Sequence, residues 1–167
     1  MSVVRELLEA NELFAASFEY GELPRPPVRK VAILTCLDAR IMPAQALGLK
    51  AGDANVIRNA GGRAADAMRS LVVSTRLLGT RAIVVIHHTD CGLHVVSNEQ
   101  IRGRIVQELG PEAAIQASAI DFLPFTDLAQ SVRDDVALIR SSPLIAPEIE
   151  VAGFVYDVRT GRLSAVE

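Results

Sequence analysis

The sequence is poor in aromatic side chains and contains no tryptophan. Only 4% of its 167 residues are aromatic, whereas half are hydrophobic, so the core must be built from aliphatic side chains. A chain of this length can bury about two thirds of the surface that its unfolded form exposes. Because repeats, low-complexity tracts and a dividing linker are absent, we expect a single domain over residues 1–167, in which residues 1–22 form an N-terminal helical arm.

Several classes of partner are excluded by what the sequence lacks. Its formal net charge is −3 and its arginines are scattered, so it has no basic surface for nucleic acid. No apolar run approaches the length of a membrane span, and the first residues lack the basic-then-apolar order of a signal peptide. We therefore expect a cytoplasmic protein that binds neither nucleic acid nor a membrane.

Cysteine is scarce, and its placement is informative. The only two cysteines are Cys36 and Cys91, which are far apart in the sequence. In a reducing compartment such a pair indicates metal binding or catalysis rather than a disulfide bond. Ordinary packing in the core is the alternative for both. Each cysteine stands in a polar cluster next to an expected strand end, which favours a metal.

Short apolar runs alternate with segments of helical periodicity. The run "VAILTC" has the continuous apolar character of a strand that is buried on both faces. Strands that alternate with helices imply a parallel sheet. We therefore expect a three-layer α/β fold with a mainly parallel central sheet and a strand extension at the C-terminus. The expected strands cover residues 31–36, 54–59 and 82–88 and a hairpin within 150–167, and the expected helices cover residues 63–79, 98–110 and 126–142.

The N-terminal arm has a separate pattern. Apolar residues recur at helical spacing from Val3 to Phe18, after a Ser2 that can cap the first turn. The Pro-rich stretch "LPRPPVRK" then separates this helix from the first strand. Because the helix has no place in the compact sheet unit, we expect it to pack on a partner subunit, in a homodimer or a higher homo-oligomer.

The carboxyl ends of two expected strands carry metal-binding side chains. Cys36 closes the first strand, and His87, His88 and Cys91 follow the third. Ligands bind at this edge of a parallel sheet, so the two segments can converge there. Two thiolates and one imidazole favour zinc. Either histidine has a spacing to Cys91 that permits chelation, and the spacing alone does not choose between them.

The stretch "CLDAR" places a carboxylate and a guanidinium beside the first thiol. If the segment is extended, Cys36, Asp38 and Arg40 project from the same face. Asp38 then has two possible partners. It can complete a closed zinc shell as the fourth ligand, or it can pair with Arg40 and leave the fourth position to water, in which case the site is catalytic. A change of pH could switch the site between these states.

Together, "CLDAR" and "HTDCG" resemble the pattern of the beta-class carbonic anhydrases, C-x-D-x-R followed by H-x-x-C-G. The stretches "LGLKAGDANVIRNAGG" and "VAGFVYDVRTGRL" resemble corresponding segments of that family, so most of the chain is covered. The resemblance implies a zinc enzyme that interconverts carbon dioxide and bicarbonate, with a dimer as its basic unit. It implies Cys36, His88 and Cys91 as zinc ligands, Asp38 and Arg40 as catalytic residues, and the N–H of Gly92 as a contact to the substrate.

Two departures from the family leave other functions open. No glutamine precedes Cys36 within the stretch that begins after Glu19, and the few aromatic residues point to an aliphatic substrate pocket. Enzymes on the same scaffold hydrolyse carbon disulfide or carbonyl sulfide, which are also linear molecules with an electrophilic carbon. A non-catalytic zinc-containing regulatory module is a third possibility, although retention of both Asp38 and Arg40 disfavours it.

Two further features have both a functional and a structural interpretation. His87 and His94 could shuttle protons, but we expect His87 to be packed and His94 to be solvated. The glycines of "RNAGGRAADA" could cradle a phosphate, but the required glycine spacing is absent. We expect Gly61 and Gly62 instead to let the turn between strand and helix pass close to the metal.

Overall fold

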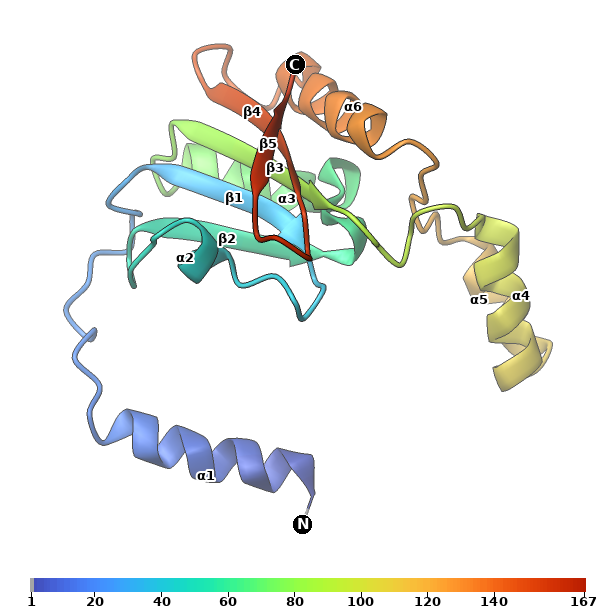
Figure 1. The fold of residues 1–167 in the computed structure, drawn as a ribbon, viewed down its shortest axis with the longest axis horizontal. Helices are drawn as coiled ribbons and strands as arrows, with labels where there is room; N and C mark the ends of the chain where they lie inside the picture. The colour runs from blue at the N-terminus through green and yellow to red at the C-terminus, as the bar shows by residue number, and fades with distance from the viewer. Residues whose placement is uncertain (1) are drawn as a thin grey trace.

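The computed structural model describes residues 2–167 and is built around one five-stranded sheet (Figure 1). The strand order is β2-β1-β3-β4-β5. The first four strands pair in parallel and β5 pairs antiparallel to β4, which confirms the mainly parallel sheet and the C-terminal hairpin. The strands are β1 (Val31–Cys36), β2 (Ala54–Asn59), β3 (Ala82–His88), β4 (Glu150–Tyr156) and β5 (Leu163–Val166).

The helices fall into a group that packs on the sheet and a group that projects from it. Helices α3 and α6 contact each other and lie on one face, with α3 against β1 and β2 and α6 against β3 and β4. Helices α1, α4 and α5 extend away from the sheet (Figure 1). The helices are α1 (Val3–Ala15), α2 (Pro43–Ala46), α3 (Ala64–Arg76), α4 (Asn98–Leu109), α5 (Glu112–Ser118) and α6 (Leu128–Ser141), with a short 3-10 turn η1 (Ala60–Gly62) before α3.

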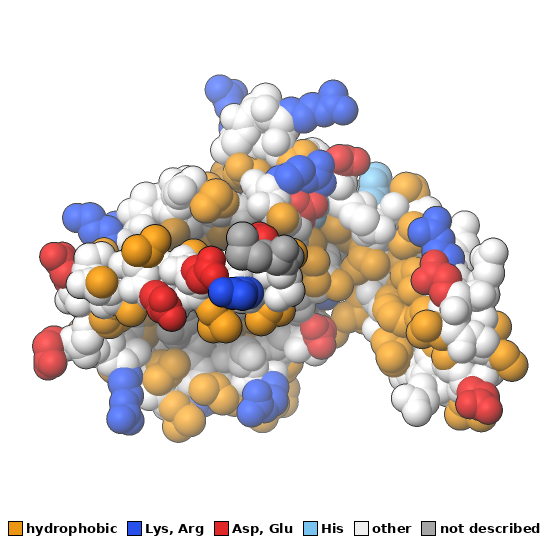
Figure 2. All heavy atoms as spheres, turned by 90° about the horizontal axis from the view of Figure 1, so that it is seen from below, with side chains coloured by type: hydrophobic (Ala, Val, Ile, Leu, Met, Phe, Trp, Pro, Cys, Tyr) orange, Lys and Arg blue, Asp and Glu red, His pale blue; other side chains and the backbone are white. Residues whose placement is uncertain are grey.

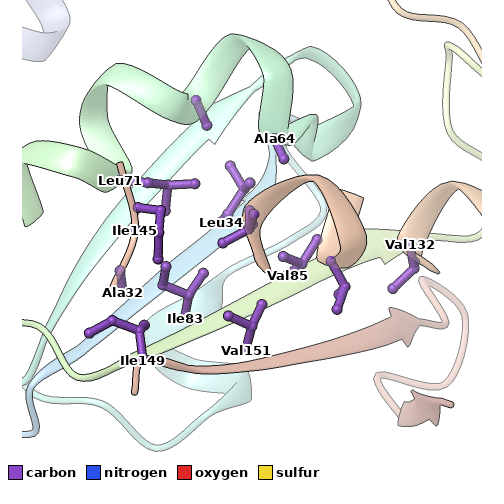
Figure 3. Close-up of a cluster of buried hydrophobic side chains, with 13 residues drawn as sticks. Ala32, Leu34, Ala64, Leu71, Ile83, Val85, Val132, Ile145, Ile149 and Val151 are labelled. Carbon is purple, nitrogen blue, oxygen red and sulfur yellow. The ribbon is translucent and has the colours of Figure 1, made fainter. Parts of the chain in front are cut away.

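The main core lies between the sheet and the α3–α6 layer, and every side chain in it is aliphatic (Figure 3). Leu34, Ile83 and Val85 come from the sheet, whereas Leu71 and Val132 come from the helices. Each large aliphatic side chain that is fully buried contributes about 1.5–3 kcal/mol to stability. This core holds β1 and β3 side by side, and these two strands carry the residues of the candidate site.

The projecting helices leave apolar side chains uncovered in the single chain. Helix α1 has no buried residue, and Val3, Val4, Leu7 and Leu8 are each more than 60% exposed. Figure 2 shows hydrophobic side chains exposed on α1 and on the projection formed by α4 and α5. Among residues 2–167, no helix combines the length and apolar character needed to cross a bilayer.

Candidate metal centre

Three metal-binding side chains meet at the carboxyl ends of β1 and β3. Cys36 is the last residue of β1, His88 is the last residue of β3, and Cys91 follows three residues later. Their ligand atoms all lie within 4.8 Å of one another, and all three residues are buried. The two strands are parallel neighbours, so the convergence expected from the sequence is confirmed.

His88 has one ring nitrogen that is left without a partner. Its Nδ1 donates to the carbonyl oxygen of Thr89 at 2.9 Å, whereas its Nε2 is buried and forms no hydrogen bond. A buried polar atom without a partner costs about 1–3 kcal/mol. A bonded Nδ1–H fixes the tautomer in which Nε2 offers its lone pair, as in metal-binding histidines. The donor set therefore fits a zinc ion.

The two thiols interact strongly with each other. A hydrogen bond to Cys91 holds the pKa of Cys36 well below its usual range, and the same bond raises the pKa of Cys91. Burial lowers the pKa of His88, but the nearby negative charge of Cys36 outweighs that effect and raises it. One thiolate is therefore ready to bind a soft cation, and metal binding would displace the second proton.

Asp38 lies beside these ligand atoms and is held by Arg40. Arg40 donates from Nε to Oδ1 at 3.0 Å and from Nη2 to Oδ2 at 2.7 Å, a two-pronged ion pair. This pair holds the pKa of Asp38 far below its usual value. The Oδ2 atom is 3.9 Å from the Nε2 atom of His88. In the structure, Asp38 therefore pairs with Arg40 while bordering the ligand cluster.

The segment from Cys36 to Arg40 is not extended, so the condition under which these side chains would share one face of a strand is not met. Strand β1 ends at Cys36, and the backbone N–H of Arg40 donates to Oδ1 of Asp38 at 2.9 Å. The N–H of Ile41 also donates to the carbonyl oxygen of Asp38, which closes a turn. Asp38 and Arg40 therefore meet through a tight turn stabilised by the Asp side chain, rather than by alternation along a strand.

Two side chains outside the expected catalytic set support this turn. Arg58 on β2 donates to the carbonyl oxygens of Cys36 at 3.0 Å and of Asp38 at 2.6 Å. Asp90 accepts from Nη1 of Arg40 at 2.6 Å, and its carbonyl oxygen accepts from Nη2. Sequence reasoning missed Asp90, although its place between His88 and Cys91 was a possible signal.

The glycine turn before α3 passes directly against the end of β1. A Cβ atom on Gly62 would come within 3.0 Å of the backbone N of Cys36 and of the backbone C of Thr35. Gly62 also has a φ of +70°, which side chains disfavour. Gly62 therefore permits a close approach of the turn to Cys36, whereas its closeness to a metal stays a prediction.

Comparison with known proteins agrees with this geometry. A family model described as carbonic anhydrase matches residues 31–163. Beta-carbonic anhydrase 1 of Mycobacterium tuberculosis is 38% identical over 167 residues, which cover 99% of each chain. The chain belongs to the beta-carbonic anhydrase family. This membership confirms the expected fold family and the expectation of an enzyme of the carbonic anhydrase type.

Two further proteins are similar to this member of the beta-carbonic anhydrase family. The structure of a carbonic anhydrase from Glaciozyma antarctica superposes with a TM-score of 0.94, at 44% identity and with all of both chains covered. A carbon disulfide hydrolase of an Acidianus species is 33% identical over 158 residues, which cover 83% of this chain and 78% of that protein. The family therefore includes relatives with a second substrate.

In this family member, the residue expected to contact substrate lies at a surface groove. Gly92 directly follows Cys91 and is exposed, with no atom within 4 Å of the position that a Cβ would occupy. The groove has a volume of about 840 Å³ and runs along α4. Its lining includes the apolar side chains Leu93, Val96 and Phe122. Most of its apolar side chains are aliphatic, in line with the low aromatic content.

The other two histidines of this beta-carbonic anhydrase family member have different surroundings. His87 is fully buried, with Nδ1 bonded to Ser131 and Nε2 bonded to Asp135, so the packing interpretation is confirmed. The expectation of a solvated His94 is wrong in part. His94 is only partly exposed because its ring stacks on Phe125 and its Nε2 bonds to a backbone carbonyl.

Proposed function

We propose that the protein is a zinc-dependent carbonic anhydrase that interconverts carbon dioxide with bicarbonate and a proton. The observation that carries this proposal is the buried Nε2 of His88, which lacks a partner and lies within 4.8 Å of both cysteine sulfurs. A closed structural site would use a fourth protein ligand. The neighbouring carboxylate, that of Asp38, is instead bonded to Arg40 through both of its oxygens.

Cys36, His88 and Cys91 would hold the zinc ion. When bound, zinc lowers the pKa of a coordinated water molecule to about 7 and so supplies the nucleophile near neutral pH. Arg40 keeps Asp38 ionised and away from the metal, which leaves its carboxylate free to accept a hydrogen bond from the attacking water. Asp38 would thereby orient that water and take part in proton transfer. Loss of the Arg40 pair would let Asp38 become the fourth ligand and close the site.

The proposed substrate contact is the backbone N–H of Gly92. The missing side chain leaves room for a close approach, and the neighbouring groove is mainly apolar. Carbon dioxide is a linear, apolar molecule. A site can bind it with one hydrogen bond to an oxygen atom and an apolar surface beside it. The electrophilic carbon would then lie between the groove and the nucleophile that Asp38 orients.

Carbon disulfide is the second candidate substrate, and it is supported by the 33% identity to a carbon disulfide hydrolase. Carbon dioxide ranks first because the beta-carbonic anhydrase of Mycobacterium tuberculosis is 38% identical and matches over nearly the whole of both chains. A non-catalytic zinc module ranks third, since Asp38 and Arg40 are both present and paired.

An assay of both substrates on one zinc-loaded sample tests the proposal. We expect rapid hydration of carbon dioxide, followed by stopped flow, and slow or no release of hydrogen sulfide from carbon disulfide. The opposite pattern would establish the hydrolase. Loss of both activities in a sample with one zinc per chain would support the non-catalytic module.

We also propose that the functional unit is a homodimer or higher homo-oligomer in the cytoplasm. The exposed apolar side chains of α1 favour packing of this helix on a second copy. Residues 1–22 would then be an arm of a single domain that spans residues 1–167. Two free thiols at the site suit a reducing compartment.

A further inference from the structure

A buried polar cluster lies on the side of β3 opposite to the metal-binding residues. Asp135 of α6 is 2% exposed and accepts four hydrogen bonds. Arg63 donates from Nε at 2.9 Å and from Nη2 at 3.2 Å, and the Nε2–H of His87 donates at 3.1 Å. The backbone N–H of Ala64 donates at 3.0 Å. The proposed reaction uses none of these groups.

Two of these contacts lead directly to metal-binding residues. Arg63 follows Gly62, whose backbone lies so close to Cys36 that no side chain fits between them. His87 immediately precedes His88, and the two side chains point to opposite faces of β3 because strand residues alternate. Asp135 is therefore bonded to Arg63, which follows the turn that packs against Cys36, and to His87, which precedes His88.

A third contact leads towards Cys91. The Nη1 of Arg63 donates to the carbonyl oxygen of Leu123 at 2.8 Å. Two residues later, the N–H of Phe125 donates to the carbonyl oxygen of Leu93 at 3.2 Å. Phe125 also packs in the small apolar cluster that contains Cys36 and Cys91. Through Arg63, Asp135 is thus connected to the segment that flanks the second cysteine.

The cluster costs free energy to bury and is fully satisfied. Burial raises the pKa of Asp135, but the bonds from His87 and Arg63 outweigh that effect and lower it. An apolar replacement of similar volume can fill such a space without loss of stability. Directional, charge-assisted hydrogen bonds also fix the relative positions of the segments that they join, because each bond sets an angle and a distance. Apolar packing does not fix them in this way.

We propose that Asp135 is a positioning residue that holds the three ligand-bearing segments in their metal-binding arrangement through His87 and Arg63. This inference rests on the proposed zinc site. It assigns to Asp135 no contact with metal or substrate. Its effect is to preorganise the ligand atoms, so that binding zinc requires little rearrangement of the chain.

The test measures the zinc dissociation constant of the full-length protein by competition with a chromophoric chelator. Asp135→Asn keeps the volume but places an amide group among four donors. We expect zinc to bind about 10- to 100-fold more weakly, the range found when partners of metal ligands are changed. We also expect the thiolate-to-metal absorption bands of the cobalt-substituted protein to change.

A matched control separates positioning from general destabilisation. Thr80 is fully buried just before the amino end of β3, and its hydroxyl bonds to Ser74 at 2.7 Å. Thr80→Val removes that bond at the far end of the same strand without a change of shape. We expect it to lower the stability to urea while leaving the zinc constant within about twofold and the cobalt spectrum unchanged.

A second variant decides the question if Asp135→Asn does not fold. In Arg63→Lys, the side chain can still pair with Asp135 but cannot also bond Leu123, and Arg63 is partly exposed, so the change is milder. We expect zinc binding to weaken several-fold. Wild-type affinity in both folded variants, or an equal loss in Thr80→Val, would overturn the inference alone. Failure of the wild-type protein to bind zinc would overturn the proposed function as well.

Discussion

Adjacent residues at the site differ in how their polar atoms are satisfied, and this difference assigns their roles. His87 has partners on both ring nitrogens, whereas His88 has a partner only on Nδ1. Asp38 has Arg40 on both oxygens and still borders the ligand atoms, since its Oδ2 is 3.9 Å from Nε2 of His88. The proposed metal-binding atom and the proposed proton-accepting group therefore lie close together.

Asp38→Asn should lower kcat for carbon dioxide hydration by roughly a hundredfold or more, because an amide cannot take the proton that the carboxylate accepts. Zinc content should stay at the wild-type value, since Asp38 does not bind the metal in the proposed open site. Stopped-flow hydration and metal analysis of the same sample measure both quantities.

Asp90→Asn is the matched control for that substitution. Asp90 also pairs with Arg40, but its side chain is 71% exposed, and such ion pairs contribute little. We expect kcat to change by less than about threefold. Equal losses in the two variants would show that Asp38 acts only by holding Arg40.

The sequence predicted which residues form the candidate site, but it did not predict the contacts that position them. The positions of Cys36 and His88 at strand ends, and of Cys91 shortly after β3, followed from buried apolar runs, and the three residues do converge. Spacing alone did not separate His87 from His88, because that choice depends on which face of β3 each side chain occupies. The contacts of Asp135 to His87 and Arg63 were not predictable at all, since these residues lie 48 and 72 positions away in the sequence.

Among the elements, the strands were predicted best. β1, β2 and β3 have the expected bounds because buried parallel strands are continuous apolar runs between turn residues. The short helices α2 and α5 were missed, since four and seven residues are too few to show an amphipathic repeat. Residues 36–40 do not take the extended form that was considered for them, because the Asp38 side chain accepts a hydrogen bond from the N–H of Arg40.

The turn η1 depends on glycine for two separable reasons, and Gly62→Ala should show both. The alanine would have to adopt a left-handed backbone conformation, and its Cβ would also meet the backbone of Thr35 and Cys36 at 3.0 Å. We expect a loss of about 2 to 5 kcal/mol in the free energy of unfolding, from strain and overpacking together. Urea unfolding of the metal-free protein measures it.

Gly79→Ala isolates the contribution of backbone strain. Gly79 has a φ of +72°, close to that of Gly62, but no atom lies within 4 Å of its Cβ position. We expect a loss of only about 1 to 2 kcal/mol. If the two variants are equally destabilised, close packing of the turn against β1 is not the reason for the glycine at position 62.

In the molecule as a whole, no apolar side chain of α1 is buried within the single chain as described. Its apolar residues Val4, Leu7 and Leu8 lie within one arc of the helix, yet all are more than 60% exposed. A helix of 13 residues is marginal in water without packing. The proposed homo-oligomer supplies the missing contact.

Leu8→Glu should therefore shift the mass in solution towards that of a single chain, because it places a charge in the proposed apolar contact. Size-exclusion chromatography with light scattering measures this shift. Arg5→Gln changes the net charge by the same amount on the polar side of α1, where Arg5 pairs with Glu9, and should leave the mass unchanged. An oligomer that withstands Leu8→Glu would mean that α1 does not form the contact.

The most direct test of the central claim is the rate of carbon dioxide hydration measured against zinc content in one preparation, as zinc is removed by a chelator and then restored. If Cys36, His88 and Cys91 form the catalytic zinc site, the rate should rise in proportion to bound zinc and level off at one zinc per chain. A rate that survives removal of zinc, or a protein with one zinc per chain that does not hydrate carbon dioxide, would contradict the account.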